Sequence, residues 1–117
     1  MYFNKILGGI VGDIIGSTRE WNNVKTEDFE LLPKGSRFTD DTVMTLAVAE
    51  WLMTDPTHSE RTLVECMQRL GCKYPNAGYG GMFRRWLATD NPEPYNSFGN
   101  GSAMRVSPVG LYANSME

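Results

Sequence analysis

The sequence predicts an all-α fold, because apolar residues recur at helical spacing in several segments and no segment of useful length alternates apolar and polar residues. Its composition, 41% hydrophobic and 21% charged, is typical of a folded globular protein and not of a disordered chain. The 117 residues suffice for a single domain, 1–117, with a core that buries roughly two-thirds of the unfolded surface.

Two helices are expected in the first half of the chain. Asn4 is expected to cap the first, which runs to about Ile15 and carries several glycines among its apolar residues. The second begins near Asp41 and should be buried on most sides, because apolar residues occupy nearly all of its faces. Between them, residues 17–37 show no periodicity and contain a Pro-Lys-Gly-Ser turn sequence, so we expect a long loop.

A third helix is expected over residues 58–70. The pattern Thr57-x-x-Glu60 is typical of a capping box, in which the two side chains satisfy free N–H groups at a helix start. Gly71 follows the last apolar residue of the stripe, so we expect the helix to stop there.

Two more helical segments are expected toward the C-terminus. Apolar residues at helical spacing predict a fourth helix from Met82 to the turn sequence before Pro92. A last helix should begin near Gly101 or Ser102, and Pro108 should bend or restart it because proline cannot donate a backbone hydrogen bond.

Charge and hydropathy exclude two classes of partner. The net charge is −3 and no cluster of lysines and arginines is interleaved with aromatic residues, so no nucleic-acid polymer is expected as a partner. The longest apolar stretch, residues 6–15, is broken by glycines and Asp13 and falls short of the ~20 residues of a membrane helix. It is followed by no small-residue cleavage pattern, so we predict a protein without membrane association in the cytoplasm.

Three residues that often carry chemistry are expected to be inert here. Cys66 and Cys72 have no cysteine or histidine cluster around them, which favours packing thiols over a disulfide or a zinc site. His58 has no neighbouring nucleophile that it could activate, so a catalytic role is not expected.

The segment Thr39-Asp40-Asp41-Thr42 at the start of the second helix has two interpretations. Hydroxyl and acidic residues are ordinary at a helix start, where they satisfy N–H groups and complement the helix dipole. Alternatively, Thr39, Asp40 and Asp41 present oxygens to Mg²⁺ or Mn²⁺, and adjacent aspartates that point apart can serve two ions. The residues by themselves favour the structural interpretation.

The segment Asn96-Ser97-Phe98-Gly99-Asn100-Gly101 also has two interpretations. It offers backbone N–H groups, an amide and a hydroxyl at a helix start, which suits the binding of an anion such as phosphate. Glycine, asparagine and serine are equally common in ordinary turns, so this segment alone is a weak signal. Arg105, one turn later, suits either a phosphate contact or an intramolecular salt bridge.

Four motifs together resemble the ADP-ribosylglycohydrolase family, of the dinitrogenase-reductase-activating glycohydrolase type. In chain order they are Gly8-x-x-x-Gly12-Asp13-x-x-Gly16, Thr39-Asp40-Asp41-Thr42, Gly78-Tyr79-Gly80 and Gly99-Asn100-Gly101-Ser102-Ala103-Met104-Arg105. The resemblance runs from Gly8 to about Tyr112 and covers the N-terminal part of such an enzyme. It implies an orthogonal helical bundle, incomplete at the C-terminus.

The resemblance also implies a reaction and its metal site. The expected reaction is metal-dependent hydrolysis of an N- or O-glycosidic bond, which releases ADP-ribose from a modified protein or small molecule. Thr39, Asp40, Asp41 and Glu20 are implied as ligands of a dinuclear Mg²⁺ or Mn²⁺ site. Glu20, Asp40 and Asp41 are implied as catalytic residues, while Asp13 is expected to be a partly buried acceptor that organises the long loop.

The family resemblance assigns ADP-ribose to the two glycine-containing segments. Gly80 and the turn before the last helix are implied to hold its phosphates and inner ribose, while Phe98 is implied to cover the adenine. The residues implied in substrate binding are Gly80, Ser97, Phe98, Gly99, Asn100 and Gly101.

Family enzymes carry a second aspartate-rich segment that this sequence lacks, so the dinuclear site is expected to be only partly supplied. Three interpretations stay open. The chain is a truncated form of a hydrolase, a short paralogue that binds ADP-ribose without catalysis, or a helical module that pairs with a copy of itself or with a complementing C-terminal half.

Overall fold

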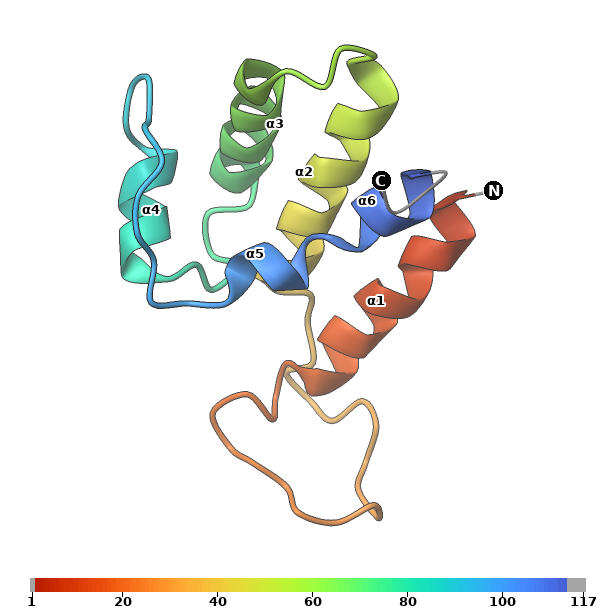
Figure 1. Ribbon diagram of the computed structural model, residues 1–117. Helices are drawn as coiled ribbons and strands as arrows, with labels where there is room; N and C mark the ends of the chain where they lie inside the picture. The colour runs from red at the N-terminus through yellow and green to blue at the C-terminus, as the bar shows by residue number, and fades with distance from the viewer. Residues whose placement is uncertain (1, 114–117) are drawn as a thin grey trace.

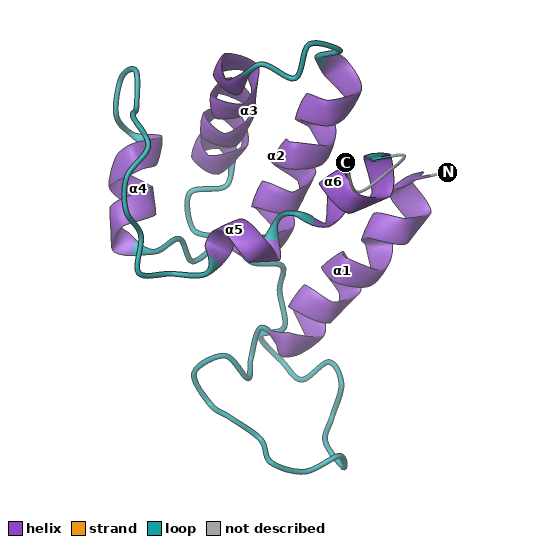
Figure 2. Cartoon of the chain, in the orientation of Figure 1, coloured by secondary structure: helices purple, strands orange, loops and turns teal. Residues whose placement is uncertain are grey.

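The predicted helices are present in a computed structural model that describes residues 2–113 and the side chains of residues 4–113. Over this range the chain forms helices and no strands (Figure 2), so the all-α prediction is confirmed. The helices are α1 (Tyr2–Gly16), α2 (Asp40–Thr54), α3 (Glu60–Lys73), α4 (Gly81–Leu87), α5 (Gly101–Met104) and α6 (Ser107–Tyr112).

Helix α2 lies at the centre of the bundle, with α3 along one side and α1 and α6 along the other (Figure 1). Helix α5 also contacts α2, while α4 packs against α3. Because neighbours surround it, α2 buries residues on most of its faces, as predicted. The buried residues are Thr42, Val43, Met44, Thr45, Ala47, Val48, Ala49 and Leu52.

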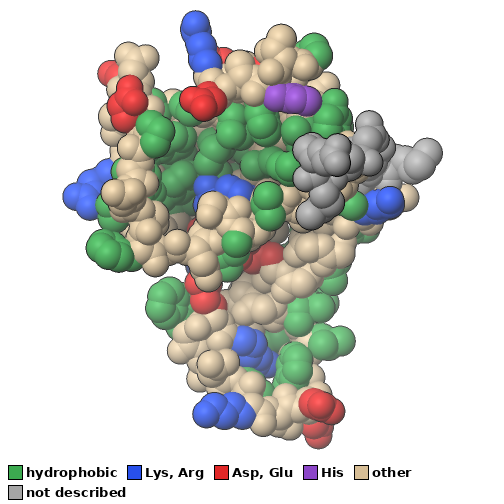
Figure 3. All heavy atoms as spheres, viewed as in Figure 1, with side chains coloured by type: hydrophobic (Ala, Val, Ile, Leu, Met, Phe, Trp, Pro, Cys, Tyr) green, Lys and Arg blue, Asp and Glu red, His purple; other side chains and the backbone are tan. Residues whose placement is uncertain are grey.

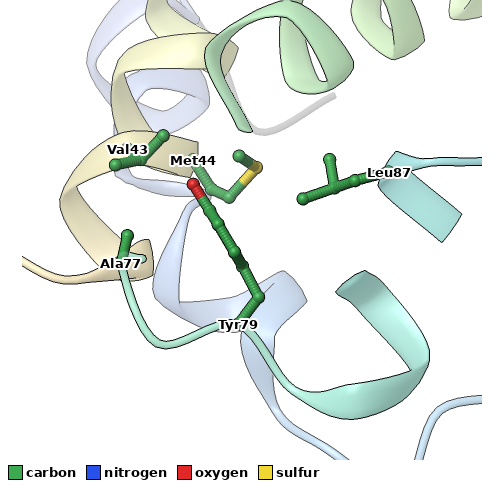
Figure 4. Packing of buried hydrophobic residues seen from close by; sticks show 5 residues of the cluster. All are labelled: Val43, Met44, Ala77, Tyr79 and Leu87. Atoms are coloured by element: carbon green, nitrogen blue, oxygen red, sulfur yellow. The ribbon is translucent and has the colours of Figure 1, made fainter. Parts of the chain in front are cut away.

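The main apolar cluster forms where α2 meets α4 and the segment before α4. Its buried members are Val43, Met44, Ala77, Tyr79 and Leu87. The side chains of Met44 and Leu87 point toward each other across the cluster (Figure 4). Tyr79 also makes a polar contact, because its hydroxyl donates a hydrogen bond of 2.8 Å to the Tyr74 carbonyl oxygen. The burial of these side chains fixes the segment before α4 against the start of α2.

The third helix differs from its prediction at both ends. The Thr57 hydroxyl donates to the Asp55 carboxylate, so Thr57 does not cap the helix. Ser59 is the cap instead, and its hydroxyl oxygen accepts from the Thr62 N–H at 3.3 Å. At the other end the helix continues through Gly71 to Lys73, so the predicted stop was wrong.

Gly71 serves packing and not termination. It is buried, and a Cβ at this position would lie 2.6 Å from Leu87 Cδ2 and 2.7 Å from Leu87 Cδ1. The absence of a side chain therefore lets α4 approach α3 closely through Leu87.

The first helix begins at Tyr2, so the prediction that Asn4 caps it was wrong and Asn4 lies inside the first turn. The long loop predicted after α1 is present and extends away from the helices over residues 17–39 (Figure 1). Pro108 lies in the first turn of α6, so the predicted restart of the last helix is confirmed. None of the helices in residues 2–113 is both long and apolar enough to cross a membrane.

The close approach at Gly71 predicts opposite effects for two glycine-to-alanine substitutions. Gly71→Ala should destabilise the protein by about 1–3 kcal/mol, because the added methyl group overpacks the contact with Leu87. Gly8→Ala, on an exposed face of α1 with open space around it, should raise stability by up to about 1 kcal/mol through helix propensity. Urea unfolding followed by circular dichroism measures both, and equal effects would contradict the packing role of Gly71.

Candidate active site

The carboxylate of Asp13, near the end of α1, binds the start of α2 through four hydrogen bonds. The Thr39 backbone N–H and hydroxyl donate to it at 2.7 and 2.6 Å, respectively. The Thr42 hydroxyl and backbone N–H donate to it at 2.6 and 3.3 Å. Asp13 is half-buried and both threonines are buried. Asp13 is thus the partly buried acceptor expected from the sequence, and it joins the two ends of the long loop.

Thr39 also has the structural role that ordinary helix capping predicts. It is the N-cap residue of α2, and its hydroxyl oxygen accepts from the Asp41 N–H at 3.3 Å while donating to Asp13. A second bond closes the loop nearby, because the Arg37 N–H donates to the Ser17 hydroxyl oxygen at 3.0 Å. The backbone that carries Asp40 and Asp41 is therefore fixed from several directions.

Asp40 and Asp41 face different surroundings, as expected for adjacent residues at a helix start. The Asp40 N–H donates to the Ala77 carbonyl oxygen at 2.7 Å. A Cβ on Gly78 would lie 3.9 Å from Asp40 Oδ1, so the Asp40 carboxylate lies beside the segment before α4. Gly78 has a φ of +95°, a left-handed conformation that favours glycine. Asp41 instead lines a cleft on the α1 side.

That cleft has a volume of about 390 Å³, and three acidic residues line it. Asp13, Glu20 and Asp41 line it, together with the glycine-bearing face of α1 and parts of α2, α5 and α6. The space-filling view shows acidic side chains within the hollow between the helical body and the long loop (Figure 3). The remaining lining residues are Gly9, Ile10, Gly12, Gly16, Ser17, Thr42, Thr45, Met104 and Ser107.

The aspartate pair carries negative charge that its surroundings only partly neutralise. Burial, then the charges of Asp41 and Glu20, raises the pKa of Asp40 to about 6. Burial, then the charges of Asp13 and Glu20, raises the pKa of Asp41. The Arg105 guanidinium lowers the pKa of both carboxyl groups, but its effect is the smaller one.

The donor chemistry of this group fits a hard divalent cation. Within residues 2–113, no side chain forms a hydrogen bond or ion pair with the carboxylates of Glu20, Asp40 and Asp41, which leaves carboxylate oxygens available to coordinate a cation. In the same part of the chain, no three acidic, histidine or cysteine side chains converge closely enough to make a complete metal site. The described residues therefore offer suitable ligands for a cation, but not a full coordination shell around one.

None of the residues expected to bind substrate lines this cleft. Gly80 is the N-cap residue of α4, and Asn100 is the N-cap residue of α5. The Ser97 hydroxyl oxygen accepts from the Gly99 N–H at 3.0 Å, while the Phe98 side chain is fully exposed. Gly101 opens α5, whose Met104 does line the cleft. Their binding of ADP-ribose stays a prediction.

Sequence reasoning missed the polar groups that α2 adds one turn into the helix. Thr42 donates to Asp13 across 29 residues, and the Thr45 hydroxyl lies 3.5 Å from the Met104 carbonyl oxygen across 59 residues. No local pattern indicates either contact, because each depends on where α1 and α5 pack. The only available signal was a hydroxyl residue at each position among the apolar residues of this helix.

Comparison with known proteins decides the family. A sequence model of the ADP-ribosylglycohydrolase family matches residues 3–117. The chain belongs to this family. The match spans nearly the whole sequence and agrees with the all-helical structure, so the resemblance seen in the motifs is confirmed. No solved structure matches the chain significantly.

For this member of the ADP-ribosylglycohydrolase family, the Asp13 contacts predict a large loss of stability on Asp13→Asn. The amide keeps one acceptor oxygen but turns an NH₂ group toward donors from Thr39 and Thr42, which should cost at least about 2 kcal/mol. The matched control is Asp28→Asn on the exposed loop, with an expected change within about 0.5 kcal/mol. Urea unfolding measures both, and a similar small loss in the two variants would show that Asp13 does not hold α1 to α2.

The raised pKa of Asp40 predicts that metal-free protein loses stability as the pH rises from about 4 to 6. In that window the folded protein binds more protons than the unfolded chain, so the free energy of unfolding falls with pH. At pH 7.5, Asp40→Asn should be more stable than the wild type by about 1 kcal/mol, a value reduced for the solvent screening of a half-buried group. The difference should vanish near pH 4, and urea unfolding in EDTA tests it. A variant less stable than the wild type at pH 7.5 would contradict this account.

Proposed function

We propose that the protein is a metal-dependent hydrolase that removes ADP-ribose from a modified protein or small molecule. One observation supports this proposal: in a member of a glycohydrolase family, the carboxylates of Glu20 and Asp41 line a cleft beside the start of a buried helix. Such a cleft offers both cation ligands and a base for water. The cytoplasmic location expected from the sequence is part of the same proposal.

Thr39, Asp40, Asp41 and Glu20 are the proposed ligands for a pair of Mg²⁺ or Mn²⁺ ions. When bound, these cations neutralise the acidic group and supply positive charge to oxygen atoms of the substrate. Thr39 keeps one lone pair for this role, since its hydroxyl donates to Asp13 and accepts from Asp41. Because no complete metal site forms within residues 2–113, we propose that further ligands come from another segment or subunit.

Glu20 is the proposed base. It lines the cleft at the rim, where the long loop leaves α1, and it is exposed, so water reaches it. The oxygen of a water molecule bonds to the anomeric carbon while the bond from that carbon to the acceptor nitrogen or oxygen breaks. Glu20 takes the water proton, and the acceptor leaves with the bonding electron pair and then receives that proton from Glu20. In the transition state the sugar ring carries positive charge and resembles an oxocarbenium ion. Nearby carboxylates stabilise this positive charge.

The glycine turn and the exposed aromatic side chain are proposed to hold the rest of the substrate. Backbone N–H groups from Ser97 to Gly101 suit the diphosphate, and Gly80 lets the chain approach closely because nothing lies within 4 Å of its missing side chain. Phe98 is proposed to cover the adenine, since its ring is fully exposed and aromatic faces stack on bases.

A second candidate function is a non-catalytic ADP-ribose-binding or self-associating module. Leu7 and Val11 on α1 are 47% and 46% exposed, which favours a further contact on this helix. Either a second copy of the chain or a complementing C-terminal half could make this contact. Sedimentation at micromolar concentration separates this candidate from a stable monomer.

The proposed chemistry predicts that Asp40→Ala with Asp41→Ala abolishes Mn²⁺-dependent release of ADP-ribose from a modified substrate. The physical reason is the loss of two carboxylate ligands, and titration calorimetry should show the loss of Mn²⁺ binding in parallel. Asp28→Asn is the matched control and should change neither measurement. Undiminished release by the double variant would contradict the assignment, while binding of ADP-ribose without release by the wild type would favour the non-catalytic candidate.

A further inference from the structure

We propose that Arg19 is a positioning residue for Glu20, which it holds at the rim of the cleft by joining the two arms of the long loop. The inference rests on the proposed function, in which Glu20 is a cation ligand and the base. It adds a residue that is neither a proposed ligand nor a proposed substrate contact. The binding of Mn²⁺ tests it independently of turnover.

The long loop leaves α1 and returns to α2 as two arms, which are joined by three nested connections. The first two are the bonds described above, from Asp13 to the start of α2 and from the Arg37 N–H to the Ser17 hydroxyl oxygen. Arg19 makes the third, because its Nη2 donates a hydrogen bond of 3.2 Å to the Glu30 carbonyl oxygen. The connections therefore close the two arms progressively from the helices outward.

Arg19 is held at its backbone and at its side chain. Its backbone N–H donates to the Gly16 carbonyl oxygen at 2.9 Å, which ties the residue to the last turn of α1. Its Cζ lies 5.6 Å from the centroid of the Phe29 ring, within the range of a cation–π interaction. The residue is half-buried and its Nε is shielded from solvent. The side chain thus bridges the outgoing arm to the returning arm.

Glu20 has no comparable support of its own. It is exposed where it lines the cleft, and within residues 2–113 no side chain forms a hydrogen bond or ion pair with its carboxylate. The residue that follows, Trp21, is 93% exposed. Consecutive Cα atoms lie about 3.8 Å apart, so the fixed position of Arg19 confines the backbone of Glu20 to the rim of the cleft.

Arg19 supports Glu20 without neutralising it. In the part of the chain that the structure describes, its guanidinium forms no salt bridge, and its contacts are with a carbonyl oxygen and an aromatic ring. The Glu20 carboxylate therefore keeps its negative charge for a cation.

Two effects of Arg19 on a bound cation oppose each other. Its positive charge repels the cation, whereas its contacts hold a ligand in place and so reduce the ordering that cation binding requires. The hydrogen bond to Glu30 is exposed, so solvent and salt screen the repulsion. Positioning should therefore dominate, and removal of the guanidinium should weaken cation binding.

The test compares four forms of the full chain: the wild type, Arg19→Met, Glu20→Gln and the double variant. Phe29→Leu provides a second route, because it removes the ring and leaves the charge of Arg19. Lys25→Met is the matched control, since it removes one positive charge from an exposed position of the same loop. The electron paramagnetic resonance signal of free Mn²⁺ at pH 7.5 gives the dissociation constant, and urea unfolding in EDTA shows that each variant is folded.

We expect Arg19→Met to bind Mn²⁺ about three- to tenfold more weakly than the wild type, and Phe29→Leu to change binding in the same direction. This loss is at the lower end of the about 10- to 100-fold that removal of a group supporting a metal ligand costs. In the Glu20→Gln background Arg19→Met should have no further effect, because no ligand is left to position. Lys25→Met should stay within about twofold of the wild type.

Equal or tighter Mn²⁺ binding by Arg19→Met, or the same loss in the Glu20→Gln background, overturns the inference and leaves the proposed metal site standing. If Arg19→Met does not fold, Phe29→Leu in both backgrounds decides by the same criterion. A Glu20→Gln variant that binds Mn²⁺ like the wild type overturns the inference together with the assignment of Glu20. A wild type that does not bind Mn²⁺ overturns the inference and the whole proposed site.

Discussion

The carboxylate of Asp13 accepts hydrogen bonds from both threonines that flank the aspartate pair, and this contact organises the acidic end of the bundle. It joins α1 to α2 across the long loop, orients the first turn of α2 and thereby directs Asp41 into the cleft. The acidic residues at this end of the bundle therefore have two different roles. Asp13 is satisfied by donors and stabilises the fold, whereas Asp40 and Asp41 are left with free oxygens.

The fold tolerates an acidic group that it does not fully neutralise, and this is typical of functional sites. Burial and mutual repulsion both disfavour ionised Asp40, as its raised pKa shows. The rigid backbone of α2, fixed by the central apolar cluster and by Asp13, holds the carboxylates together despite this cost. At Asp40 and Asp41, the negative charge that suits the binding of a cation therefore lowers the stability of the metal-free fold.

Much of the fold was predictable because apolar spacing depends on local sequence, and α2 is the clearest example. The ends of the helices were less predictable, since tertiary contacts decide between competing local signals. Thr57 and Ser59 are both suitable caps, and only the Asp55 carboxylate, which binds the Thr57 hydroxyl, leaves the role to Ser59. Gly71 is a plausible stop by composition, but Leu87 packs on it and the helix continues.

The candidate site also has a part that the sequence could predict and a part that it could not. Glu20 and Asp41 line one cleft, and their roles there stay a prediction, whereas the contacts of Thr42 and Arg105 depend on the packing of distant segments. The long loop between α1 and α2 has its two ends bonded to each other, through Ser17 with Arg37 and Asp13 with Thr39. Because closing a longer loop costs little additional entropy, the length and sequence of this loop can change while the contacts that join α1 to α2 are preserved. The loop is thus the part of this fold that can vary in length and sequence at the least cost in stability.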